Sequence, residues 1–196
     1  MGRSGVIPGK QRPGRCESSS ITSGQERLLC AILLNPALRP VEKTITYHNV
    51  RSALPLVSCT KLVIANLLNV ATKDAPELNR AAVGQQETAK ARELISEALR
   101  QADEVLLAWG MGGMAGDVRI ALQGQTVWLF EALQQHDLSH VWTVTGRPRH
   151  PSRWRQYVGP EKQRVTGSCF EERLGKVLTM TSLDSEAGRN LFDRAF

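Results

Sequence analysis

The sequence has few aromatic residues and no long hydrophobic run. Only 5% of its 196 residues are aromatic, so leucine, valine, isoleucine and alanine must supply most of the core that a hydrophobic content of 41% allows. No apolar run reaches the roughly 18 residues of a membrane-spanning helix. The basic N-terminus lacks the apolar stretch of a secretory signal. These absences predict a cytoplasmic protein without a membrane partner.

Cysteines are also scarce, and their spacing does not match a metal site. The four cysteines include no Cys-x-x-Cys pair and have no histidine at ligand spacing. Disulfide frameworks are typical of shorter secreted chains that are rich in cysteine. We therefore expect free thiols, no metal and no cofactor.

Positive charge is in excess. The formal net charge is +6, and residues 1–15 hold four cations and no acid. Residues 1–24 contain little that a core would bury, so they predict a disordered basic arm. The excess charge favours a polyanionic partner such as DNA, although the arm alone also raises the net charge.

Residues 25–180 alternate between apolar segments and amphipathic segments. The first kind predicts strands at 27–34, 61–70, 104–109 and 140–145. The second kind predicts helices at 44–56, 84–100, 118–136 and 171–178, with a further helix start at Asp74 and a cap at Asp117. This alternation predicts a single α/β domain with three layers, α/β/α, around a central, mostly parallel sheet. Residues 181–196 predict a polar C-terminal tail.

Three predicted strands end in polar or glycine-containing loops. Asn35 follows the first strand, Trp109 and Gly110 end the third, and His150 lies in the loop after the fourth. Ligands of open α/β sheets bind at the carboxyl ends of the strands, so we expect these residues to share one pocket. Each has a plainer interpretation, because Asn-Pro and glycine-rich segments commonly form simple turns.

The loop around His150 is rich in arginine. Arg147, Arg149 and Arg153 lie near this histidine, and cations disfavour its protonation. A neutral imidazole can donate a hydrogen bond, while the arginines can hold phosphates. Trp154 and Tyr157 add possible stacking surfaces. The alternative is a solvated basic loop without a ligand.

Four segments, taken in order, resemble a bacterial and phage family of domains of unknown function. They are Leu34-Asn35-Pro36-Ala37, Asn66-Leu67, Ala108-Trp109-Gly110 and the loop from Gly146 to Pro151. That family in turn is similar to the uracil-DNA glycosylase superfamily, whose Asn-Pro and His-Pro-Ser motifs match Asn35-Pro36 and His150-Pro151-Ser152.

The resemblance implies a uracil-DNA-glycosylase-like fold and two catalytic residues. Asn35 would position the hydrolytic water, and His150 would stabilise negative charge on the departing base. The resemblance and the basic loop together give the substrate-binding candidates: Pro36, Tyr47, Asn66, Trp109, Gly110, Arg147, Arg149, Pro151, Ser152 and Arg153. Among them, Tyr47 is the candidate for stacking on the base.

The sequence thus predicts a DNA glycosylase-like enzyme that hydrolyses the N-glycosidic bond of a damaged or modified base. Such an enzyme must turn the base out of the duplex. Two alternatives stay open. One is a non-catalytic nucleic-acid-binding module of the same fold, and the other is a hydrolase or transferase of free nucleosides or nucleotides.

Overall fold

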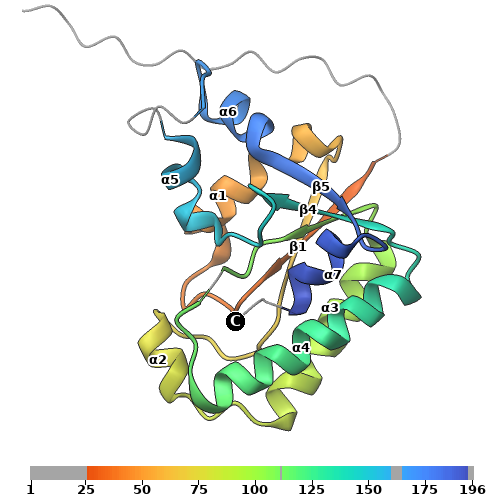
Figure 1. Cartoon of the computed structure of the whole chain (residues 1–196). Coiled ribbons are helices and arrows are strands. Elements are labelled where there is room, and N and C mark those ends of the chain that lie inside the picture. Colours follow the sequence, from red (N-terminus) through yellow and green to blue (C-terminus); the bar gives the residue numbers. More distant parts are fainter. Residues whose placement is uncertain (1–25, 111, 160–164, 194–196) are drawn as a thin grey trace, which may run out of the picture.

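A five-stranded sheet forms the centre of the molecule, with helices on both of its faces (Figure 1). The computed structural model describes residues 26–110, 112–159 and 165–193. The strands are β1 (Leu28–Leu33), β2 (Lys61–Asn66), β3 (Glu104–Leu107), β4 (His140–Val144) and β5 (Leu178–Ser182). Their order in the sheet is β2-β1-β3-β4-β5, with β1 to β4 parallel and β5 antiparallel to β4.

The helices fall largely in the predicted segments. They are α1 (Ile45–Arg51), α2 (Ala75–Arg80), α3 (Gln85–Gln101), α4 (Gly116–Gln135), α5 (Arg155–Val158), α6 (Phe170–Val177) and α7 (Glu186–Asp193), with short 3-10 turns η1 (Val41–Lys43), η2 (Leu54–Val57) and η3 (Pro151–Arg153). The α/β class with a mostly parallel central sheet is confirmed. A uracil-DNA-glycosylase-like arrangement remains a prediction.

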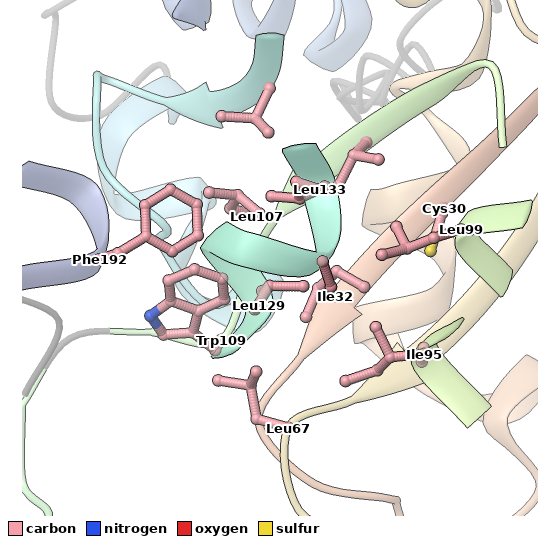
Figure 2. Close-up of a cluster of buried hydrophobic side chains, with 14 of the residues drawn as sticks. Cys30, Ile32, Leu67, Ile95, Leu99, Leu107, Trp109, Leu129, Leu133 and Phe192 are labelled. Atoms are coloured by element: carbon pink, nitrogen blue, oxygen red, sulfur yellow. The ribbon is translucent and has the colours of Figure 1, made fainter. Parts of the chain in front are cut away.

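Strand β1 is buried on both faces, which explains why its sequence is apolar throughout. Cys30 and Ile32 face one helix layer, and Leu29, Ala31 and Leu33 face the other, all of them buried. A parallel strand covered on both faces needs apolar residues at every position. Helices α3, α4 and α7 cover the first face, and α1 and α6 cover the second (Figure 1). Figure 2 shows the core of the first face.

The C-terminal segment is the main difference from the sequence prediction. Where a polar tail is predicted from residue 181, the chain completes β5 along β4 and then forms α7. Three apolar side chains explain the difference, because Leu183, Leu191 and Phe192 are all buried. The ring of Phe192 lies 6.0 Å from that of Trp109, so α7 backs the end of β3 (Figure 2).

Smaller predictions also need correction. Ala115, rather than Asp117, is the N-cap of α4, and Asp117 lies in the first turn, where a carboxylate still favours the helix dipole. The predicted helix at 44–56 is split into α1 and η2. Cys30 and Cys59 are free thiols as expected, whereas Cys169 is disulfide-bonded. The predicted basic arm lies outside the described residues.

The order of the strands creates a crevice at their carboxyl ends. After β1 the chain moves to β2 on one side, and it later returns to β3 on the other side. The loops that leave β1 and β3 therefore diverge, and such switch points are where open α/β sheets bind ligands. None of the helices that the structure describes is long and apolar enough to cross a membrane.

Candidate functional site

A cavity of about 660 Å³ lies at the carboxyl ends of β1, β3 and β4. Asn35, Trp109, Gly110 and His150 all line it, so the convergence expected from the sequence is present. A second cavity of about 460 Å³ also includes Asn35 and His150 in its lining. The two candidate catalytic residues therefore lie where the cavities meet.

The side chain of Asn35 is held in one orientation. Its Nδ2 donates to the carbonyl oxygens of Pro36 and Val70, each at 3.2 Å, and to Oγ1 of Thr72 at 3.0 Å. Because a carbonyl only accepts hydrogen bonds, these contacts fix which end of the amide is the donor. Within the described part of the chain, Oδ1 has no hydrogen-bond partner, so it is left to accept one from a ligand or water.

The surroundings of His150 favour its neutral form. The backbone N–H of Ser152 donates to its Nδ1 at 3.3 Å, so Nδ1 acts as an acceptor and the ring proton is on Nε2. Burial lowers the pKa of His150 below its ordinary value of 6.5, and the nearby charge of Arg153 lowers it further. The sequence prediction of a neutral donor is therefore supported, with burial as the larger cause.

Gly110 explains how the loops after β3 and β4 approach each other. Its backbone has φ of 92°, a conformation that favours glycine, and a Cβ here would lie 3.1 Å from Cβ of His150. Its N–H also donates to the carbonyl of Pro148 at 2.6 Å. A side chain at this position would strain the backbone and crowd His150.

Buried hydrogen bonds fix the loop that carries His150. Nε1 of Trp154 donates to the carbonyl of Arg149 at 2.8 Å, and Nδ2 of Asn49 on α1 donates to the carbonyl of Pro151 at 2.8 Å. Trp154 is fully buried, so its predicted role as a stacking surface is wrong. It anchors the loop in the core between the sheet and α1.

Cations surround the larger cavity. Arg149, Arg153 and Lys73 line it, together with the carboxylate residue Asp74. The guanidinium carbon of Arg149 lies 4.5 Å from the centroid of the Tyr157 ring, which also lines the cavity. This end of the sheet is therefore suited to an anionic ligand.

The other predicted binding residues are divided between the cavities and their surroundings. Pro36 and Asn66 line the second cavity, and Ser152 lines the first. Arg147 is exposed and lines neither cavity. Tyr47, on α1, also lies outside both linings, so the structure does not bring it to the site.

Sequence reasoning missed Thr72 and Lys73, which line both cavities. Their position gave a clue, because they follow β2, whose carboxyl end lies at the same edge of the sheet.

Across the described ranges, no group of three or more His, Cys, Asp or Glu side chains is placed to hold a metal ion. Burial raises the pKa of the Cys30 thiol to about 12 and that of Cys59 to about 11.

Comparisons with known proteins place the chain in a family without a known function. No curated protein and no solved structure matches the sequence. Nothing found links the chain to the uracil-DNA glycosylase superfamily, so that resemblance stays a prediction. Residues 19–152, more than half of the chain, match a family described as "Protein of unknown function (DUF1643)". The chain therefore belongs to the DUF1643 family.

Proposed function

We propose that the protein hydrolyses the N-glycosidic bond of a modified or damaged base in DNA. One observation carries the proposal: an oriented amide oxygen and a neutral imidazole donor line the same cavity. Asn35 supplies the first and His150 the second.

Asn35 fits the attacking side of this reaction. Oδ1 would accept a hydrogen bond from a water and hold it against C1′ of the deoxyribose. Glycosidic bonds break through an oxocarbenium-like transition state, so the water needs positioning more than it needs a strong base. The contacts of Nδ2 with three acceptors, which share its two N–H groups, keep this oxygen in place before the substrate arrives.

His150 fits the departing side. As the C1′–N bond breaks, its electron pair passes to the base, and the Nε2–H would donate to an oxygen of the resulting anion. Preorganised donors aimed at developing charge are among the strongest catalytic devices in enzymes. The attacking water supplies the hydroxyl group of the sugar product and, in the end, the proton of the released base.

DNA is the favoured substrate because cations outnumber acids around the cavity. Lys73, Arg149 and Arg153 line it with a single carboxylate residue, Asp74. That carboxylate is already engaged, since its Oδ1 accepts the N–H of Glu77 at the start of α2. The phosphates of a nucleic acid would complement these cations.

The test is base release across a panel of DNAs that carry modified, damaged and ordinary bases, in single and double strands. The full chain should release at least one base and leave an abasic site. The Asn35→Ala/His150→Ala double variant, purified in the same way, serves as the control for contaminating activity. Release from free nucleotides alone would instead favour a nucleotide hydrolase, and binding without any release would favour a non-catalytic module.

A further inference from the structure

The guanidinium of Arg149 is partly buried and lacks an acidic partner. Its Nε is shielded from solvent and has no hydrogen-bond partner, and its Cζ lies over the Tyr157 ring at 4.5 Å. No carboxylate of the described chain pairs with it. A buried donor left unpaired costs free energy, so native structures keep few such groups without a ligand or water.

Several other arginines of the described chain are satisfied by partners within the fold. Arg27 donates to Glu104 at 2.6 Å, Arg92 to Oε1 of Gln125 at 2.6 Å, and Arg173 to the carbonyl of Val158 at 2.6 Å. These side chains bind within the fold and have clear structural roles. Arg149 differs because its guanidinium lies over the Tyr157 ring and donates no hydrogen bond to a described residue.

Two further cations share the cavity with Arg149. Neither the Nζ of Lys73 nor the guanidinium of Arg153 forms an ion pair within the described ranges, and both residues are exposed at the rim. Three cations without partners around one cavity predict a ligand with more than one anionic oxygen. The planar fork of arginine matches the paired oxygens of a phosphate better than an ammonium group does.

We infer that Arg149, held on Tyr157, binds a phosphate group of the substrate, with Lys73 and Arg153 adding charge at the rim. On the proposed function, this phosphate is attached to the nucleoside that reaches Asn35 and His150. The ligand class is then a phosphorylated nucleoside, either free or within DNA, and an unphosphorylated nucleoside binds weakly. Arg149 positions the substrate and takes no part in bond cleavage.

The first experiment measures thermal unfolding of the full chain with millimolar inorganic phosphate, against chloride at equal ionic strength. Phosphate should raise the melting temperature of the wild type and of Arg155→Ala, an exposed arginine on α5 outside the cavity lining. It should raise that of Arg149→Ala and Arg149→Lys much less, since bound ligand stabilises by mass action. An equal rise in all four proteins, or no rise in the wild type, would overturn the inference.

A second readout does not depend on the stability of the variants. Because the indole N–H of Trp154 donates to the carbonyl of Arg149, its NMR resonance reports on this loop. Phosphate should shift that resonance in the wild type and leave it in place in Arg149→Lys. The same shift in both proteins would contradict a site at Arg149.

Binding of a nucleoside, its 5′-monophosphate and a short single-stranded oligonucleotide then identifies the source of the phosphate. The wild type should bind both phosphorylated ligands more tightly than the nucleoside, and Arg149→Ala should lose that preference. Tighter binding of the oligonucleotide assigns the phosphate to DNA, and equal binding assigns it to a free nucleotide. None of these measurements uses base release, so the phosphate site can stand even where the proposed reaction fails.

Discussion

The cations at the two ends of the parallel strands differ in whether they have acidic partners. At the amino ends, Arg27 pairs with Glu104, and Lys61 pairs with Glu26. At the carboxyl ends, Arg149 and the other two cations of the larger cavity have no acidic partner among the described residues. The named cations at the first end are paired within the fold, whereas those at the second have no such pairing, and we propose that they bind a ligand.

The histidines at the two ends show the same contrast. At the amino end, Nε2 of His140 lies 3.5 Å from Oε2 of Glu104, which also accepts Nε1–H of Trp142 at 2.8 Å. At the carboxyl end, His150 lies near the positive charge of Arg153 and its Nδ1 accepts a backbone N–H instead. The two histidines thus differ in the charge of their neighbours, which the residue type alone does not show.

The largest expected effect concerns the floor of the carboxyl-end cavity. Phe192→Ala should lower the free energy of unfolding by about 3–5 kcal/mol, because its buried ring packs between Trp109 and Phe130. Met180→Ala on β5 is the control, since Met180 is 56% exposed and its truncation should have little effect. Chemical denaturation measures the free energy of unfolding of both variants. Equal values for the two would show that the packing of α7 on Trp109 does not stabilise the protein.

The amino-end network should affect stability but not activity. Glu104→Ala leaves the donors of Arg27 and Trp142 without their partner, which should cost about 1–3 kcal/mol of unfolding free energy. Base release at a temperature where the variant is folded should match that of the wild type. A large loss of rate in the folded variant would contradict the prediction that the amino-end network affects only stability.

The unpaired cations should control the salt dependence of DNA binding. Replacing Arg149 and Arg153 together with Ala should weaken binding and reduce the slope of log affinity against log salt by about 2. The control replaces Lys90 and Arg100 on α3, both paired with glutamates of their own helix. Binding titrations across a range of salt give the slopes, and identical slopes for both double variants would remove the electrostatic argument.

The smallest effect is a pH dependence of stability. Since burial lowers the pKa of folded His150 below 6.5, the unfolded chain binds this proton more readily. The free energy of unfolding should therefore fall as pH drops below about 6.5, the unfolded value, towards the lowered folded pKa. His150→Gln should lose this component, whereas exposed His48→Gln should keep it. Denaturation at several pH values measures the difference, and parallel curves would argue against a partly buried, neutral His150.

Much of the fold followed from local patterns. Apolar segments covered on both faces predicted β1 to β4, and Thr44 and Asp74 cap their helices through side-chain oxygens. Strand β5 escaped prediction because it is an edge strand with mostly exposed or partly exposed residues, so its pattern resembles a loop. Helix α7 is short, and its buried position depends on the packing of Phe192 against Trp109 and Phe130, which local sequence does not show.

The site was predictable in its main residues but not in their surroundings. Strand ends identified Asn35 and His150, because parallel strands bring their carboxyl ends together. Sequence spacing did not show that Trp154 faces the core or that Tyr47 lies away from the cavity. Two of the partners of Asn35, Val70 and Thr72, come from a loop more than 30 residues away, and such contacts are set by tertiary packing.

The central claim is that Asn35 and His150 act on one bond within one cavity, and single-turnover base release from saturating DNA tests it most directly. Asn35→Ala and His150→Ala should each slow release on the order of 10²-fold or more, as lost transition-state groups do. DNA affinity should change far less, because phosphate contacts supply most of it. Release at the wild-type rate by either variant, or losses in rate and affinity of equal size, would contradict the account.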